Sequence, residues 1–124
     1  MSPFDVEALS KSANAGPVAM LNLVKYRNRE AYAEYGKLTA RLVADHGGRM
    51  LWAGSVAEVV LDEGGGTDWD FAAIVLYPSR QAFIDLITSQ QYLDANEVRR
   101  EGVVRHVVLA ADTMQFEDIV QPSR

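Results

Sequence analysis

The sequence of 124 residues contains no cysteine. Disulfide bridges, thiolate metal sites and cysteine nucleophiles are therefore excluded, and any chemistry must come from oxygen and nitrogen side chains. Glycine and proline are scarce, with 9 and 4 residues, and 48% of the chain is apolar, which excludes a disordered or low-complexity protein. At this length we expect a single globular domain.

Positive charge and long apolar runs are scarce as well. Twelve Lys and Arg residues stand against seventeen Asp and Glu, which gives a net charge of −5. An acidic chain of this kind is not expected to bind nucleic acid or an anionic membrane surface. No run approaches the ~20 apolar residues that span a bilayer, and the first residues lack the pattern of a signal peptide. We therefore expect a cytoplasmic protein without a nucleic acid or membrane partner.

The hydrophobic pattern predicts a short helix followed by strand, helix, strand, strand, helix and strand. The short helix is expected over about residues 2–12 with Ser2 as its N-cap, the core of the domain over about 17–112, and a C-terminal tail over 113–124. Apolar runs predict strands over 18–24, 50–61, 69–77 and 103–111.

Two longer helical regions are predicted between these strands. The first begins after Asn28, a good N-cap, and ends at Gly47. The second begins after Ser79, and a further helical piece follows it around residues 90–102. One face of the second region is predicted to be buried and holds Phe83, Leu86 and Ile87.

This order of elements predicts the architecture. Two strand-helix-strand units with right-handed crossovers form a four-stranded antiparallel sheet with both long helices on one face. The predicted fold class is α+β, a ferredoxin-like βαββαβ domain with an extra N-terminal helix. In a sheet with one face in water, apolar and polar residues alternate along each strand. Here both alternate sets of strand residues, which point to opposite faces of the sheet, are apolar. We therefore expect a homodimer in which a second copy covers the other sheet face.

The two parities of the strands differ in character, and this difference locates a candidate site. The smooth aliphatic parity is expected against the helices and holds Leu21, Leu23, Ile74 and Leu76. The other parity is expected to face the partner subunit and holds Asn22, Tyr26, Phe71, Tyr77 and Trp69. An apolar cavity with a few convergent polar groups there would suit a small organic ligand. The alternative is that Asn22 only bonds a neighbour and that the aromatic rings fill the interface.

Two histidines are candidates for different roles. His46 precedes Gly47 at the predicted end of a helix, where an imidazole caps the last carbonyl groups. His106 interrupts an apolar strand and is the one group suited to general base catalysis near neutral pH, with Tyr26 as the second catalytic candidate. The alternative for His106 is a core histidine with satisfied hydrogen bonds. Arg105 is expected on the opposite face.

Other polar groups offer weaker signals. Tyr92 and Arg99 lie seven residues apart in the last predicted helical segment and share a side, where they would guard a cavity or bind an anionic group. The alternative is that Arg99 pairs with Glu97, Glu101 or a carboxylate of the partner. The acidic residues near the triple glycine match no metal-binding loop, and we expect a solvated hairpin tip without a metal. These residues are Asp62, Glu63, Asp68 and Asp70.

Several short motifs resemble a known family as a set. They are MLNLVKYR at 20–27, HGGRMLWAG at 46–54, the pair Trp69-Asp70, YPSRQAF at 77–83, and Tyr92 seven residues before Arg99. Over roughly residues 17–110 the chain resembles the DUF1330 family, a group within the dimeric α+β barrel superfamily. The resemblance implies a ferredoxin-like protomer and a face-to-face dimer. The wider superfamily includes cofactor-independent monooxygenases, haem-degrading and peroxidase-like enzymes, and lactone isomerases.

The leading functional interpretation is a homodimeric barrel that binds a small, partly apolar organic molecule in a cavity on the sheet, without a cofactor. The residues expected to bind it are Asn22, Tyr26, Trp52, Trp69, Phe71, Tyr77, Tyr92 and Arg99. One alternative is a cofactor-independent monooxygenase or isomerase acting on a small aromatic or lactone-type substrate, in which His106 removes a proton while Asn22 and Tyr26 orient a substrate oxygen. A second alternative is a haem-binding barrel with His46 or His106 as ligand.

Overall fold

A computed structural model describes residues 2–114. The elements in chain order are α1 (Val6–Ser10), β1 (Val18–Tyr26), α2 (Arg29–Asp45), β2 (Arg49–Ser55), β3 (Phe71–Tyr77), α3 (Arg80–Ile87), α4 (Gln90–Gly102) and β4 (Val103–Ala111). The predicted order of elements is confirmed. Most of the predicted C-terminal tail, from residue 115 onwards, lies outside the described residues.

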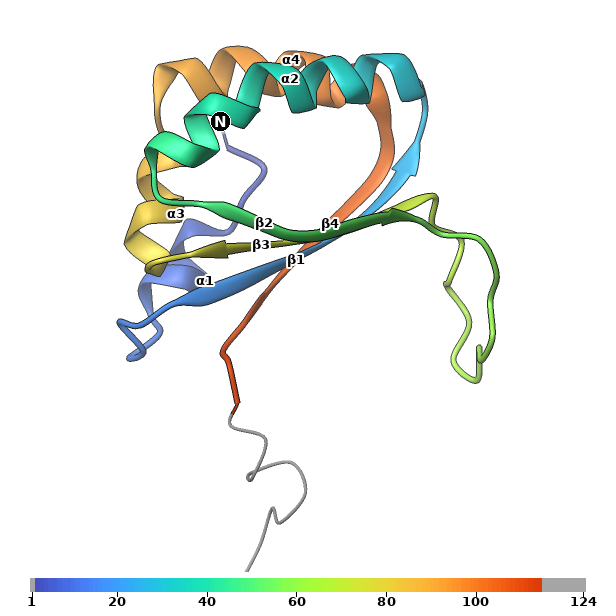
Figure 1. The fold of residues 1–124 in the computed structure, drawn as a ribbon, viewed down its shortest axis with the longest axis horizontal. Coiled ribbons are helices and arrows are strands. Elements are labelled where there is room, and N and C mark those ends of the chain that lie inside the picture. The colour runs from blue at the N-terminus through green and yellow to red at the C-terminus, as the bar shows by residue number, and fades with distance from the viewer. Residues whose placement is uncertain (1, 115–124) are drawn as a thin grey trace, which may run out of the picture.

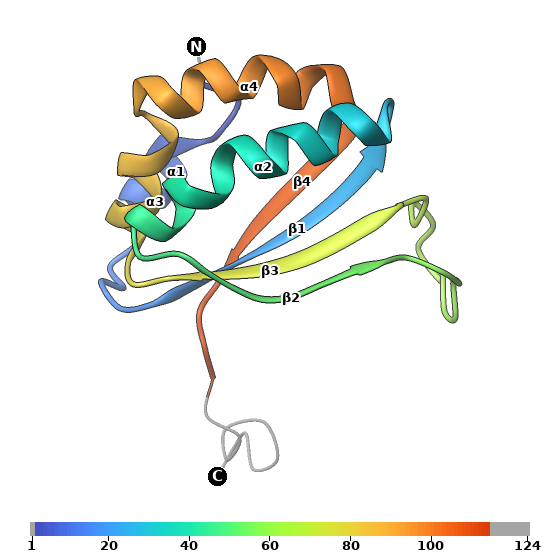
Figure 2. The same ribbon diagram turned by 45° about the horizontal axis from the view of Figure 1, so that its top comes forward.

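The four strands form one antiparallel sheet in the order β2-β3-β1-β4. Helices α2 and α4 lie side by side over one face of this sheet, and α1 and α3 lie together at one end of it (Figures 1 and 2). This arrangement confirms the predicted α+β, ferredoxin-like fold. Within residues 2–114, none of the helices has the length and apolar content needed to cross a bilayer.

The predicted helix caps account for where the long helices begin and end. Asn28 Oδ1 accepts a hydrogen bond from the backbone N–H of Ala31 at 3.0 Å, and Ser79 Oγ accepts one from Ala82 at 3.1 Å. Gly47 follows the C-cap of α2 with a positive φ of 80°, a conformation that glycine adopts without strain. These local signals are readable from the sequence because each depends on residues within one turn.

The N-terminal helix is shorter than predicted and begins later. Its N-cap is Asp5, whose Oδ1 accepts from the backbone N–H of Ala8 at 2.9 Å. The expected cap, Ser2, instead accepts from the N–H of Phe4 at 3.1 Å and forms a turn ahead of the helix. The carboxylate at Asp5 outcompetes the Ser2 hydroxyl because a negative charge is stabilised at a helix N-terminus.

Strand β2 is also shorter than the predicted span 50–61. It ends at Ser55, which pairs with Phe71 at the start of β3. The pairing ends with the backbone N–H of Val56, which donates to the carbonyl of Asp70 at 2.9 Å. Asp70 also bonds β1, through its N–H to the carbonyl of Val24 and through its carboxylate from the N–H of Tyr26, both at 2.8 Å, and residues 57–61 are not part of a strand. Residues 56–70 form a long connection, here called the arm, that extends beyond the sheet and bends away from the helices (Figure 1).

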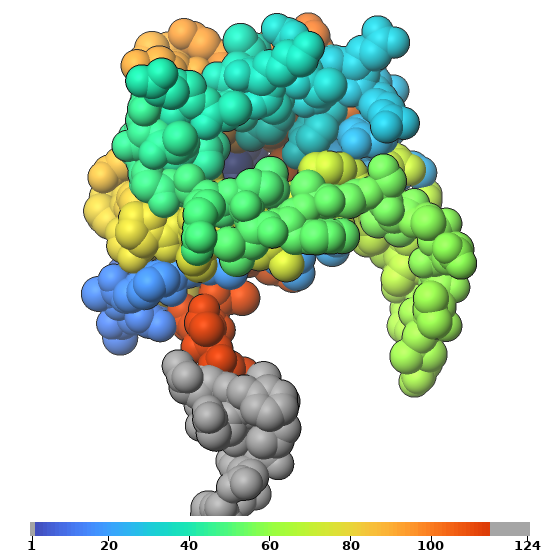
Figure 3. All heavy atoms as spheres, in the orientation of Figure 1, coloured from blue at the N-terminus to red at the C-terminus, as the bar shows by residue number. Residues whose placement is uncertain are grey.

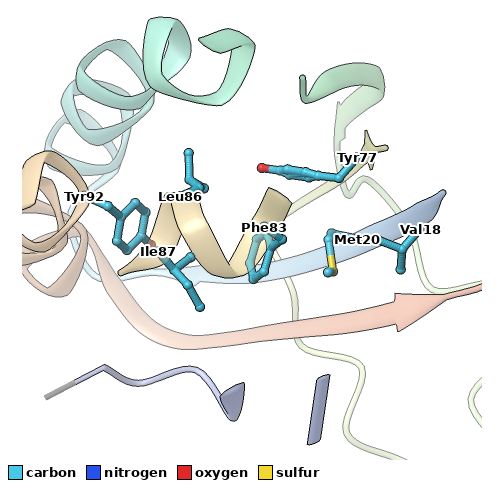
Figure 4. Packing of buried hydrophobic residues seen from close by; sticks show 7 residues of the cluster. All are labelled: Val18, Met20, Tyr77, Phe83, Leu86, Ile87 and Tyr92. Carbon is cyan, nitrogen blue, oxygen red and sulfur yellow. The ribbon is translucent and has the colours of Figure 1, made fainter. Parts of the chain in front are cut away.

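The hydrophobic core fills the layer between the helices and the sheet. Figure 4 shows side chains from β1, the end of β3, α3 and α4 gathered in this layer. They are Val18, Met20, Tyr77, Phe83, Leu86, Ile87 and Tyr92, all at most 6% exposed. The predicted buried face of the second helical region is thereby confirmed.

The strand residues that face the helices are not the set that we predicted, but the alternate set. Val18, Met20 and Val24 are buried beneath the helices, and Asn22 shares their face. The aliphatic set of Leu21, Leu23, Ile74 and Leu76 lies on the other face, called here the open face. Our prediction was wrong because both parities are apolar enough to be buried, so alternation does not decide between them. On the helix side, Arg99 of α4 bonds His106, and His106 bonds Asn22, so the polar side chains of this parity are satisfied there.

Candidate functional site

A cavity of about 490 Å³ lies between α2 and the half of the sheet formed by β2 and β3. Figure 3 shows the molecule hollowed between these elements. The floor of this α2 cavity is formed by Phe71, Ala73, Val75 and Tyr77 of β3. Its roof is formed by residues of α2 that include Tyr32, Tyr35, Thr39 and Val43.

The sequence of α2 explains why space remains beneath it. Tyr32, Tyr35 and Thr39 recur at helical spacing and point one face of α2 toward the sheet. Gly36 and Ala40 lie between them on the same side and have little or no side chain to fill the gap. The result is a pocket with aromatic and aliphatic walls and a few hydroxyl groups.

The tyrosine hydroxyls of the α2 cavity are neutral near pH 7. Burial raises the pKa of Tyr32 and of Tyr77, and it raises the pKa of Tyr35 well above its usual range. The hydroxyl of Tyr35 also shares a hydrogen bond of 2.7 Å with the hydroxyl of Tyr92. These groups are therefore suited to hydrogen bonding with a ligand and unsuited to accepting a proton from one.

A chain of hydrogen bonds links α4 to the sheet beside this cavity. Arg99 donates from Nη1 to His106 Nδ1 at 3.1 Å and from Nε to Asn96 Oδ1 at 2.7 Å. Since a guanidinium can only donate, His106 Nδ1 must accept, and its proton lies on Nε2. That nitrogen donates to Asn22 Oδ1 at 3.0 Å, and Asn22 Nδ2 donates to the carbonyl of Met20 at 3.2 Å.

This chain holds the His106 imidazole in its neutral form. Burial, together with the nearby Arg99 cation, lowers the pKa of His106 to about 4. Both ring nitrogens are engaged, so protonation at Nδ1 requires loss of the bond from Arg99. His106 is therefore arranged as a positioned polar group of the core, and neither nitrogen is free to take a proton from a substrate.

The structure brings most of the predicted site residues into the layer between helices and sheet. Phe71 and Tyr77 line the α2 cavity, whereas Asn22, Arg99 and His106 form the hydrogen-bonded chain. Tyr92 is buried on the same side of α4 as Arg99, as the seven-residue spacing predicts. The expected location facing a partner subunit was wrong for these residues, since the helices of the same chain cover them.

Three predicted residues lie elsewhere. Tyr26 lies at the end of β1 against the rings of Tyr32 and Phe71, outside the lining of the α2 cavity. Trp52 pairs with Ile74 on the open face and is 54% exposed. Trp69 lies under the guanidinium of Arg105, 4.3 Å from its ring centroid.

The structure also shows which charged groups pair within the chain. Arg99 does not pair with Glu97 or Glu101, and the ion pair with Glu97 is made by the next residue, Arg100, at 3.8 Å. In the acidic loop, Asp68 and Asp70 bind Lys25 at 2.9 and 3.5 Å. Residues 2–114 contain no group of three or more His, Asp or Glu side chains that could hold a metal ion.

His46 takes the helix-capping position that was predicted for it. It is the C-cap of α2, and its Nδ1 lies 2.9 Å from the carbonyl oxygen of Leu42. Neither His46 nor His106 lines the α2 cavity.

The residues that sequence reasoning missed are those of α2. Nothing singled out Tyr32, Tyr35 and Thr39 as site residues, because the inner face of a helix is normally filled by core packing. The available signal was two small residues, Gly36 and Ala40, next to two tyrosines on one helix face, which indicates room beside hydroxyl groups.

Comparison with known proteins places the chain among proteins of this fold. The family model described as a domain of unknown function (DUF1330) matches residues 19–113. A solved structure of a protein of unknown function from Rhodopseudomonas palustris is 26% identical and has a TM-score of 0.81, over 91% of this chain and 95% of that chain. A search of curated proteins found no match.

Two more distant structures show the fold alone. A dimeric protein of unknown function with a ferredoxin-like fold from Bacteroides fragilis is 12% identical with a TM-score of 0.53, over 79% of this chain and 97% of that chain. Hydroxynitrile lyase from Passiflora edulis is 14% identical with a TM-score of 0.62, over 83% of this chain and 99% of that chain.

Proposed function

The chain belongs to the DUF1330 family, and for this member we propose binding of a small, partly apolar organic molecule in the α2 cavity. The observation that carries the proposal is the cavity itself, with about 490 Å³ of space between α2 and the β2–β3 half of the sheet. Protein interiors are close-packed, and ligand sites are commonly concave, mostly apolar and of a few hundred Å³.

The lining favours a ligand with an apolar body and one or two hydrogen-bonding groups. The floor side chains Phe71, Ala73 and Val75 offer no polar atom, whereas Tyr32 and Tyr77 offer neutral hydroxyls. Arg49 is the one cationic side chain among the described residues that line the cavity, and it is exposed. A phenol, a quinone or another small cyclic molecule would match this arrangement.

The geometry supports binding over proton-transfer catalysis. An oxygenase or isomerase without a cofactor needs a proton acceptor beside its substrate. The tyrosines of the cavity keep their protons at neutral pH, and His106 lies outside the lining with both ring nitrogens engaged. A haem-binding role gains no support either, because neither histidine lines the cavity.

The proposal is tested with a matched pair of alanine substitutions in β3. Ala73 forms part of the cavity floor, and Ala72 is adjacent to it with its side chain on the open face. In fluorescence titrations with 2-naphthol and indole as probes, Ala73→Leu should weaken binding by about tenfold because the added methyl groups occupy the cavity. Ala72→Leu should bind as the unmodified protein does.

Two results would contradict ligand binding in the α2 cavity. One is that neither probe binds the unmodified protein. The other is that Ala73→Leu, shown to be folded by its circular dichroism, binds with unchanged affinity.

We also propose that the chain forms a homodimer through the open face. Support comes from the apolar side chains that the helices leave uncovered there, which are Leu21, Leu23, Ile74, Leu76, Val107 and Leu109. The arm carries three further apolar residues, Val59, Val60 and Leu61, which are 56%, 93% and 72% exposed. It bends to the same side of the sheet (Figure 1), where a second copy would cover it.

A further inference from the structure

A second and smaller cavity, of about 250 Å³, lies between the N-terminal segment and β4. It is lined by Pro3, Phe4, Asp5, Arg99, His106 and Val108, and we call it the Arg99 cavity. It shares no lining residue with the α2 cavity, so the two sites can be tested independently.

Arg99 is buried without a negatively charged partner. Its side chain belongs to a residue that is only 8% exposed, and both of its hydrogen-bond partners, Asn96 and His106, are neutral. Among residues 2–114, no carboxylate lies within 4.0 Å of its guanidinium, although the other half-buried cations have such partners, two for Lys25 and one for Arg80. A guanidinium stays charged in a protein, and burial of an uncompensated charge is costly.

One end of the guanidinium remains available to a ligand. Nε and Nη1 are engaged, whereas Nη2 has no hydrogen-bond partner among the described residues. Nη2 therefore keeps accessible surface, because no fully buried side-chain nitrogen in the described residues lacks a hydrogen-bond partner, and Arg99 is one of the residues that line the cavity. The site therefore presents a fixed positive charge with free N–H groups inside a concave pocket.

We propose that the Arg99 cavity binds the carboxylate of a small organic acid, with Arg99 as the recognition residue. A planar guanidinium matches a carboxylate in shape and in charge. The side chains of Pro3, Phe4 and Val108 form apolar walls that would hold the hydrocarbon part of the acid. This site goes beyond the binding proposed for the α2 cavity.

The charge balance of the pocket favours a monoanion over a phosphate group. The lining contains one cation, Arg99, and one carboxylate, Asp5, and His106 is neutral. Arg99 can neutralise one negative charge, so a monoanion leaves no unpaired charge on the ligand, whereas the second charge of a dianion would remain unpaired beside the Asp5 carboxylate. Asp5 is held in place as the N-cap of α1, so it cannot leave the pocket without loss of the cap.

The experiment titrates the full chain with benzoate at pH 7 by isothermal calorimetry. Arg99→Met should weaken benzoate binding by about tenfold or more because the ion pair is lost. Arg100→Met is the matched control, since Arg100 is the adjacent residue and pairs with Glu97 on the surface. It should leave the affinity unchanged.

Asp5→Asn provides a test that leaves Arg99 in place and does not depend on the folding of Arg99→Met. Asparagine is as good an N-cap as aspartate, so α1 should persist while the negative charge disappears. Benzoate should then bind about two- to fivefold more tightly. Ala73→Leu should not change benzoate binding, which separates this site from the α2 cavity.

Three results would overturn the proposal. The first is equal benzoate affinity for Arg99→Met and the unmodified protein. The second is unchanged or weaker binding by Asp5→Asn. The third is binding of benzyl alcohol as tightly as benzoate, or of inorganic phosphate more tightly, since either would show that a carboxylate is not what the pocket recognises.

Discussion

His106 illustrates how a residue's chemistry is set by its neighbours. In the sequence it is a histidine suited to proton transfer near pH 7. In the structure Arg99 donates to its Nδ1 and its Nε2 donates to Asn22, so the ring is neutral and fully engaged. Asn22 is 84 residues from His106, and Arg99, although only seven residues away, lies in α4 while His106 lies in β4, so no spacing in the sequence indicates that the three meet.

The lowered pKa of His106 predicts how stability depends on pH. Its pKa is about 4 in the folded protein and near 6.5 in an unfolded chain, so between these values the unfolded chain binds more protons. The free energy of unfolding should therefore decrease as the pH is lowered, by about 2 kcal/mol from this group between pH 7 and pH 5. Urea unfolding at the two pH values measures this loss.

Two substitutions isolate the contribution of His106. Glutamine at this position keeps a polar side chain without a titrating group, so His106→Gln should lose most of the pH dependence. His46→Gln should retain it, because His46 caps α2 at the surface end of the helix. Equal pH dependence in both variants would show that His106 is not the group responsible.

At the scale of the elements, the contact between α2 and the end of α4 depends on one glycine. A Cβ atom on Gly102 would lie 2.7 Å from the backbone nitrogen of Tyr32 and 2.9 Å from its Cα. The carbonyl of Gly102 also accepts from the backbone N–H groups of Arg27 and Asn28. The start of α2 is thus held directly against the junction of α4 and β4.

Gly102→Ala should consequently destabilise the fold. The methyl group meets backbone atoms, which cannot rotate away as a side chain would, and we expect a loss of about 1–3 kcal/mol in the free energy of unfolding. Gly36→Ala is the control within α2, because nothing lies within 4 Å of a Cβ placed there. It should stabilise the protein by about 0.5–1 kcal/mol through helix propensity.

Chemical denaturation of both glycine variants gives the comparison. A Gly102→Ala protein as stable as the unmodified one would mean that α2 is free to move away from α4. The close approach of Gly102 to Tyr32 would then contribute nothing to stability, and the prediction for Gly102→Ala would be wrong.

Elements were predictable from sequence where their signals are local. Asn28 and Ser79 cap the helices that follow them, as expected from residue type and position. The end of β2 was not predictable, because it depends on where the residues before β3 leave the sheet, and Asp70, which bonds Val56, is separated from it by the length of the arm. An apolar run such as residues 56–61 carries no information on whether a partner strand exists.

At the scale of the whole molecule, the helices cover only one face of the sheet (Figures 1 and 2). The open face and the arm leave apolar side chains exposed, which underlies the proposed homodimer. Leu109 lies on the open face and Leu38 lies on α2, and each is 50% exposed. Their equal exposure makes them a matched pair for a test of association.

Leu109→Asp should shift the protein toward monomer, because a charge would be buried in the interface without a partner. Leu38→Asp should leave the association state unchanged. Sedimentation velocity at micromolar concentration distinguishes a 13.7 kDa monomer from a species of twice that mass. A monomeric unmodified protein, or equal behaviour of the two variants, would contradict the homodimer.

The sequence by itself determined the fold class, the order of the elements, both caps of α2 and the N-cap of α3, because these depend on periodicity and on neighbours within a few residues. It also determined that any chemistry uses oxygen and nitrogen side chains. Only the tertiary structure decided which sheet face the helices cover, since both parities of the strands are apolar. That choice placed Asn22, Arg99 and His106 in one buried chain and opened the two cavities, because such groups meet only when α4 packs across β1 and β4.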